Sequence, residues 1–199
     1  AHRLALHLGR ADVDGLLGEM TAAQLLEWRA FAADEPFGFE PLADLFAIHL
    51  IPTLQVFLGM IPAYVAVTRP DPGLRWLMWV AFVIGIGAVA LEFFADLQLH
   101  RFVAARRPGQ ALDTGLWSWS RHPNYFGECS FWFAVALFGV AAAPRDAWWL
   151  FAGALLMLIL FLAASIPMME QRSLERRPEY QDVIDRVSKF VPRPPRIRR

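Results

Sequence analysis

The amino-acid sequence predicts an all-α protein: a polytopic helical membrane protein with about four transmembrane helices, preceded by a short soluble helical segment. Three observations lead to this prediction. Apolar residues make up 56% of the 199-residue chain, more than a soluble domain of this size readily buries. The 19 basic and 19 acidic residues are almost absent from the middle of the chain. Uncharged runs long enough to cross a bilayer as helices recur between residues 42 and 169.

The predicted spans are separated by two short polar connections and one long polar stretch. The first span carries no charge over 24 positions, and its Pro52 and Pro62 are tolerated in a membrane helix that packs among neighbours. Residues 96–128 form a polar, arginine-rich stretch between the second and third spans, and residues 170–199 begin as a helical extension of the fourth. The four spans are predicted at residues 45–68, 76–95, 129–143 and 147–169.

The distribution of basic residues predicts the orientation of the spans. Four spans place the N-terminal segment, the 96–128 stretch and the C-terminal tail on one face, and the connections at 69–75 and 144–146 on the other. The first face carries four arginines in the 96–128 stretch and nine Lys or Arg residues from Arg172 onward, whereas the second carries three arginines. Because cytoplasmic loops are enriched in Lys and Arg, we expect both termini in the cytoplasm. As a separate expectation, the membrane is a bacterial inner membrane.

Residues 1–41 differ from the rest of the chain and are predicted to form a separate soluble helical segment. They carry seven acidic and three basic residues and no apolar span. A capping box at residues 21–24 opens a helix, and the sequence DEPFG at residues 34–38 ends it. We therefore expect two domains, 1–41 and 42–199, with a boundary near Pro41.

Composition and spacing exclude several kinds of site. Cys129 is the only cysteine, which excludes an internal disulfide and a cysteine-based zinc centre, and no two histidines have metal-ligand spacing, so we expect no metal site. Basic and acidic residues cancel, so nothing favours nucleic acid as a partner. Gly85, Gly87 and Ala90 match the spacing of a dinucleotide-binding turn, but they lie within a span without a preceding strand, and we interpret them as small residues for helix packing. We interpret His49, inside the first span, as a packed, hydrogen-bonded residue.

The densest group of polar side chains lies at the predicted start of the third span. Its members are Arg121, His122, Asn124, Tyr125 and Glu128. Arg and His bind phosphate or carboxylate groups, Arg through paired hydrogen bonds, and Asn and Tyr offer directional donors and acceptors. This combination predicts a ligand-binding site. The alternative is an ordinary interfacial loop whose Arg and Trp side chains contact lipid headgroups.

Two further groups of charged residues are predicted at the same membrane face. Glu92 and Asp96 are four residues apart, hence on one face of a helix, and Glu170 and Arg172 lie at the end of the fourth span. Carboxylates at that depth are costly unless they line a wet cavity or have partners. The groups therefore predict a shared pocket between helix ends. The alternative is that Glu92 and Glu170 form structural ion pairs with arginines of the connecting loop.

The segment LDTGLWSWSRHPNYFGE at residues 112–128 resembles the C-terminal signature of the steroid 5-alpha-reductase superfamily, closest to its bacterial branch of uncharacterised multi-span membrane proteins. The resemblance runs from about residue 45 to residue 195. It implies a helical membrane oxidoreductase that holds NADPH at the cytosolic ends of its C-terminal helices. It also implies a hydrophobic lipid or steroid-like substrate that is taken from the bilayer.

The same resemblance implies roles for individual residues. Asp96, Asn124 and Glu128 correspond to the cofactor-facing acid, asparagine and glutamate of that superfamily. The motif residues that share this role are Arg121, His122 and Tyr125. We also expect Glu92, Glu170 and Arg172 beside the cofactor.

The resemblance covers only part of a reductase. In the reductases the catalytic glutamate and tyrosine lie in an N-terminal half, where this chain has residues 2–38 instead. That stretch resembles a minor tail, or tail-assembly, protein of tailed phages. We therefore expect the 199-residue chain to bind a nucleotide cofactor but to reduce enone steroids poorly.

Two other functions agree with the same residues. Isoprenylcysteine carboxyl methyltransferases share an Arg-His-Pro-x-Tyr-x-Gly core and bind S-adenosylmethionine in the same location, so a membrane methyltransferase is the second possibility. A non-catalytic membrane domain that tethers a helical interaction module is the third. Asn124 and the pair formed by Glu92 and Asp96 favour the reductase branch.

Overall fold

The computed structural model describes residues 49–69, 74–107 and 109–195. The chain divides into two compact units, residues 1–52 and 53–199, so nearly all described residues belong to the second. Within these ranges the chain forms helices, turns and loops and no strand, which confirms the all-α prediction. The helix predicted at residues 21–33 and the domain boundary near Pro41 lie outside the described residues.

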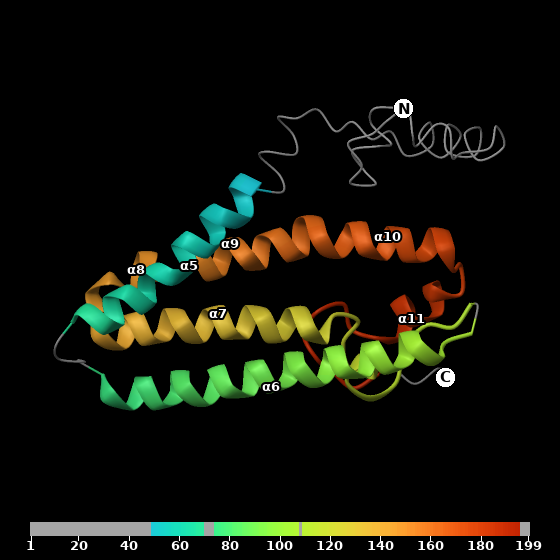
Figure 1. Cartoon of the computed structure of the whole chain (residues 1–199), viewed down its shortest axis with the longest axis horizontal. Helices are drawn as coiled ribbons and strands as arrows, with labels where there is room; N and C mark the ends of the chain where they lie inside the picture. Colours follow the sequence, from blue (N-terminus) through green and yellow to red (C-terminus); the bar gives the residue numbers. More distant parts are fainter. Residues whose placement is uncertain (1–48, 70–73, 108, 196–199) are drawn as a thin grey trace, which may run out of the picture. The chain divides into compact units, whose positions relative to one another are not determined.

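The described chain is a succession of helices, with one long connection between α6 and α7. Helix α6 runs beside α7 in the opposite direction, and α9 and α10 follow one another along a further line (Figure 1). A π-helical turn at Phe161–Ser165 separates α9 from α10. It ends two residues before Pro167, which lacks an N–H and crowds the carbonyl one turn earlier, so a widened turn relieves the clash. The elements are α5 (Ile51–Thr68), α6 (Arg75–Ala105), the 3₁₀ turn Gly115–Ser118, α7 (Pro123–Ala142), the 3₁₀ turn Pro144–Asp146, α8 (Ala147–Leu150), α9 (Ala152–Leu160), α10 (Ile166–Arg176) and α11 (Tyr180–Arg186).

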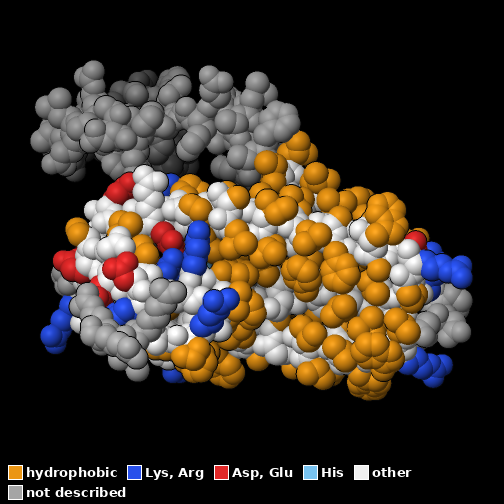
Figure 2. Space-filling model, turned by 180° about the vertical axis from the view of Figure 1, so that it is seen from behind, with side chains coloured by type: hydrophobic (Ala, Val, Ile, Leu, Met, Phe, Trp, Pro, Cys, Tyr) orange, Lys and Arg blue, Asp and Glu red, His pale blue; other side chains and the backbone are white. Residues whose placement is uncertain are grey.

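Four of these helical stretches are long and apolar enough to cross a membrane: Ile51–Thr68, Arg75–Ala105, Pro123–Ala142 and Pro144–Arg176. Their outward side chains are apolar, and Trp79 and Trp148 are 71% and 85% exposed. Figure 2 shows a broad band of hydrophobic side chains between ends that carry charged ones. Such a surface suits lipid rather than water, as in an integral membrane protein. The four predicted spans are therefore confirmed.

The boundaries of the two middle spans differ from the prediction. Only residues 106–122 of the stretch 96–128 connect the two helices, because α6 continues to Ala105 and α7 already begins at Pro123. Residues 96–107 contain no Gly or Pro and several good helix formers, so the helix continues past the apolar run. Pro123 fits the first turn of a helix, where its missing N–H costs nothing. Asp96, Asn124 and Glu128 consequently lie on helices rather than in a loop.

Small residues allow the helices to approach one another closely. A Cβ atom added to Gly127 on α7 would lie 3.0 Å from the carbonyl oxygen of Ala88 on α6, and one added to Gly139 would lie 2.7 Å from Cβ of Pro62 on α5. A Cβ on Gly153 of α9 would collide with the backbone of Gly59 on α5. Close backbone approach through small residues is typical of helix packing in membranes.

The orientation of the spans can be measured with introduced cysteines. Gln110 lies in the connection before α7 and Arg145 in the turn after it, separated by a helix roughly 30 Å long. In a Cys129→Ala background, a cysteine at position 145 should react with a membrane-impermeant maleimide in intact cells. A cysteine at position 110 should react only after permeabilisation, because arginine-rich loops face the cytoplasm. Labelling of both positions from the same side would contradict this topology.

Candidate functional site

The predicted polar residues meet at one end of the described unit. The end of α6, the start of α7, the end of α10, α11 and the segment after α11 lie together there (Figure 1), and charged side chains of both signs gather on the surface at this end (Figure 2). The connection before α7 is fixed against α6 by two hydrogen bonds. Trp117 Nε1 donates to the carbonyl oxygen of Ala95 at 3.0 Å, and the backbone N–H of Leu116 donates to Oε1 of Gln98 at 2.9 Å.

Arg121 joins three segments of the chain. It is 7% exposed. Its Nε donates to Oε1 of Glu170 on α10 at 2.6 Å, and its Nη1 donates to the carbonyl oxygens of Ile184 and Val187 at 2.9 and 2.7 Å. Its backbone N–H donates to the carbonyl oxygen of Ser188 at 2.8 Å. These donors face protein acceptors, so the guanidinium of Arg121 holds the site together.

His122 and Ser120 extend the same network. Nε2 of His122 lies 3.3 Å from the Glu170 oxygen that Arg121 contacts, and the imidazole is buried. The Ser120 hydroxyl donates to the carbonyl oxygen of Phe190 at 2.7 Å and accepts from the backbone N–H of His122 at 3.1 Å. For Glu170, the structure therefore agrees with the alternative prediction of a structural ion pair with a loop arginine.

Asn124 and Asp96 connect α7 to α6. The Asn124 amide nitrogen donates to Oδ1 of Asp96 at 3.0 Å. Asp96, Glu92 and Glu128 lie close enough together to interact electrostatically. Within the described residues none of these three carboxylates forms an ion pair with a basic side chain, unlike Glu170. They are therefore available to accept hydrogen bonds or to face a positive charge.

A pocket of about 470 Å³ opens beside these carboxylates along one face of α6. Two carboxylates and an imidazole line it together with apolar side chains. A ligand there can therefore form hydrogen bonds to the polar groups and pack against the apolar ones. The residues that line it are Val89, Glu92, Phe93, Asp96, Leu97 and His100.

Tyr125 occupies the space between α7 and α10. Its ring stacks on Phe161 with centroids 4.2 Å apart and on His122 at 5.6 Å, and its hydroxyl lies 2.9 Å from Sδ of Met169. Ring contacts thus already orient the phenol, and its hydroxyl points toward the end of the fourth span.

Arg172 is the one predicted residue that the structure leaves outside this group. It is exposed on α10. Two residues after Glu170, it points about 200° away around the helix. Arg186 of α11, which the sequence analysis did not single out, pairs instead with Asp113 at 3.0 Å and Asp182 at 2.7 Å. Hydrogen bonds to these two carboxylates raise the pKa of Arg186 above its ordinary value.

Two further polar residues escaped the sequence analysis. Burial raises the pKa of the Tyr180 phenol above its usual value, and the charge of Glu170 acts in the same direction, so Tyr180 stays protonated. Gln55 on α5 is 2% exposed, and its Nε2 has no hydrogen-bond partner among the described residues. A lone amide within an apolar span is the signal that could have identified it.

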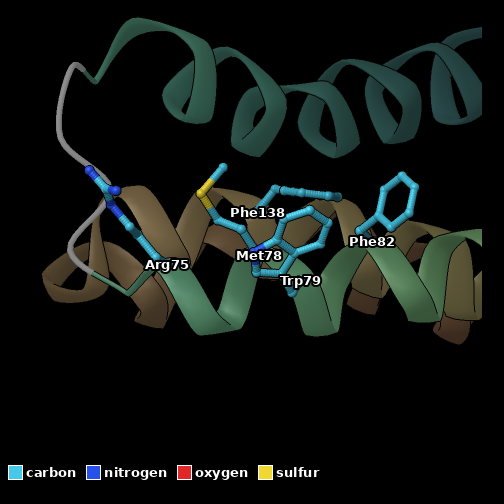
Figure 3. A pocket seen from close by; sticks show the side chains of 5 residues that line it. All are labelled: Arg75, Met78, Trp79, Phe82 and Phe138. Carbon is cyan, nitrogen blue, oxygen red and sulfur yellow. The ribbon is translucent and has the colours of Figure 1, made fainter.

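An apolar pocket of about 360 Å³ lies at the opposite end of α6 (Figure 3). Apart from Arg75 it is lined by Met78, Trp79, Phe82 and Phe138. Arg75 precedes Asp96 by 21 positions on one helix, which corresponds to roughly 30 Å. This pocket is therefore separate from the polar group, and its lining is apolar except for Arg75.

Comparison of the sequence with known proteins assigns the chain to a family. Residues 27–187 match the family described as protein of unknown function (DUF1295). An uncharacterised protein of the fission yeast Schizosaccharomyces pombe is 28% identical over 198 residues, and the match covers 88% of this chain and 57% of the yeast protein. The chain thus spans little more than half the length of that relative. No solved structure matches.

The family match begins at residue 27, ahead of the first apolar span. The likeness of residues 2–38 to a phage tail protein stays a prediction. The match covers all four spans and every candidate site residue. The chain therefore belongs to the DUF1295 family, which is part of the steroid 5-alpha-reductase-like group.

Proposed function

We propose that this chain is a membrane-embedded oxidoreductase-type domain that binds NADPH at the ends of α6, α7 and α10 and acts on a hydrophobic lipid or steroid-like substrate. The observation that carries the proposal is the 3.0 Å hydrogen bond between Asn124 and Asp96. It lies beside Glu92 and Glu128, which form no ion pair with a described basic side chain, and a pocket of about 470 Å³. Membership of the steroid 5-alpha-reductase-like group supports the same activity.

The chemistry of the side chains fits such a cofactor. A nicotinamide dinucleotide offers ribose hydroxyl and carboxamide donors together with negatively charged phosphates. Asp96, Glu92 and Glu128 are acceptors for hydroxyl and amide donors. Exposed Lys189 and Arg193 line a second polar pocket, of about 340 Å³, at the same end, where they can pair with phosphates. When bound, the cofactor supplies a hydride.

The remaining residues hold this arrangement in place. Arg121 and Glu170 lock the start of α7 to α10, and Trp117 locks the preceding turn to α6. The side chains that face a ligand are thereby held on rigid helices, which favours precise positioning. The apolar surface of the spans lets a lipid-soluble substrate reach the site from the bilayer.

One observation favours a second function. Three carboxylates that have no basic partner among the described residues suit a ligand that carries positive charge, and the sulfonium of S-adenosylmethionine is such a group. Membrane methyl transfer is therefore the alternative to reduction.

Removing the Asn124–Asp96 pair tests the proposal. Asn124→Ala and Asp96→Asn should each weaken NADPH binding by about 1–3 kcal/mol, the cost of losing a hydrogen bond to a partly buried or charged group. The dissociation constant is measured by titration calorimetry on the detergent-purified chain. Gln171→Ala, which removes an exposed amide on α10, is the matched control and should leave it unchanged. Variants that lose thermal stability yet keep the wild-type NADPH affinity would assign the pair to helix packing alone.

A further inference from the structure

Four arginines converge on a pocket that the proposed cofactor site does not use. The pocket has a volume of about 410 Å³ and lies where the end of α6 meets the end of α10. Its walls come from two segments some 70 positions apart in the sequence. They contain no acidic residue: the lining residues are Arg106, Arg107, Gly109, Gln110, Arg176 and Arg177.

The positive charge of this pocket is not neutralised within the described chain. None of its four arginines forms an ion pair with a described carboxylate. The pocket of about 340 Å³ beside Lys189 and Arg193 differs, because two of its arginines have acidic partners. Arg121 pairs with Glu170, and Arg186 pairs with Asp113 and Asp182. Cations at helix C-termini are favoured by the helix dipole. That effect accounts for arginines at the end of each helix separately, but not for their meeting in one pocket without an acid.

One hydrogen bond joins the two walls of the pocket, and two more shape the turn in one of them. Nη1 of Arg177 donates to the carbonyl oxygen of Gln110 at 3.0 Å. The backbone N–H of Arg107 donates to Oε1 of Gln110 at 2.9 Å, and the N–H of Gln110 returns to the carbonyl oxygen of Arg107 at 3.2 Å. Gly109 adopts a φ of 80°, which permits this tight turn because glycine has no Cβ. The turn after Arg106 and Arg107 is therefore shaped, and Arg177 is held against it, before any ligand binds.

We propose that this pocket binds a phosphoryl group. The guanidinium group is planar and forms paired, charge-assisted hydrogen bonds to phosphate oxygens. The pocket lies beyond the apolar part of two spans, and clusters of Lys and Arg just outside a transmembrane helix bind anionic lipids. The phosphoryl group can belong to a lipid headgroup or to a free phosphate compound. The inference does not depend on the proposed NADPH-dependent activity.

Ligand-dependent thermal stabilisation of the full chain in neutral detergent tests the proposal without any nucleotide. One arm titrates inorganic pyrophosphate. A second titrates dioctanoyl phosphatidic acid, with dioctanoyl glycerol as the matched lipid that lacks the phosphate. A ligand that binds only the folded protein raises its melting temperature. Arg106→Gln and Arg176→Gln remove exposed charges from opposite walls, and each should weaken the apparent affinity about tenfold, the factor that corresponds to one lost charge-assisted hydrogen bond. Arg101→Gln removes an exposed arginine of α6 that does not line the pocket.

Each outcome has a defined meaning. Stabilisation by both ligands, reduced by the two pocket variants but not by Arg101→Gln, establishes a site open to free phosphate. Stabilisation by phosphatidic acid alone, with the same dependence on variants, establishes a lipid headgroup site. Absence of stabilisation in both arms, or equal losses in all three variants, overturns the proposal. Because no arm contains NADPH, failure here leaves the cofactor proposal untouched, and failure of NADPH binding leaves this one untouched.

Discussion

Replacing Arg121 with alanine should lower the free energy of unfolding by about 3–5 kcal/mol, the usual cost of removing one partner of a buried ion pair. The variant leaves the Glu170 carboxylate, whose side chain is only 13% exposed, opposite an imidazole alone. It also leaves the carbonyl oxygens of Ile184 and Val187 without their donor. Thermal unfolding in detergent, or titration with a denaturing detergent, measures the loss.

Two further variants test whether burial of Arg121 causes this loss of stability. Arg186→Ala removes an arginine that also joins separate segments, but whose side chain is 28% exposed. It should therefore cost only about 1 kcal/mol or less. Arg121→Lys keeps the charge, but its donors sit on one nitrogen and cannot replace both Nε and Nη1 of the planar guanidinium, so it should fall between wild type and alanine. Equal losses for Arg121→Ala and Arg186→Ala would contradict the structural role assigned to Arg121.

Replacing Gly153 with valine should destabilise the packing of α5 against α9 by about 3 kcal/mol, the upper part of the range for overpacked cores. A Cβ at this position meets the backbone of Gly59 and Leu58. Backbone atoms cannot rotate away as a flexible side chain can, so the two helices must separate. The same unfolding measurement in detergent reports the change.

Gly87→Ala is the control for this prediction. Gly87 also lies inside a membrane span, but an added Cβ meets no atom within 4 Å. Alanine there should be neutral or stabilise the helix by about 0.5–1 kcal/mol, because it has the higher helix propensity. If Gly153→Val lowers the free energy of unfolding no more than Gly87→Ala does, α5 and α9 do not approach as closely as described.

The spans were predictable from sequence, whereas their ends were not. A long run without charge has few alternatives to a membrane helix, which is why all four spans were identified. Polarity marks where a helix leaves the hydrocarbon, not where it ends. Residues 96–105 are polar but favour helix, so α6 continues, and Pro123 starts α7 before the apolar run. Asn124, Tyr125 and Glu128 of the motif thus lie on α7, whereas Arg121 and His122 precede it.

Partner choice within the site depends on distances that the sequence does not contain. Arg121 and Glu170 were each singled out, but their pairing joins positions 49 apart. Arg172 could have been set aside earlier, because a spacing of two places it across the helix from Glu170. The glycine pattern at Gly85 and Gly87 indicated close packing, yet the tightest helix contacts involve other glycines, since packing depends on which face meets a neighbour.

The most direct test of the proposed function compares two cofactors on the wild-type chain. The detergent-purified protein is melted with NADPH and with S-adenosylmethionine, each at the same series of concentrations. A ligand present at 100 times its dissociation constant stabilises the folded state by about 2.7 kcal/mol, well above the resolution of the measurement. We expect NADPH to raise the melting temperature more than S-adenosylmethionine does. Stabilisation by S-adenosylmethionine alone would contradict the reductase-type assignment and make this chain a methyltransferase-type domain.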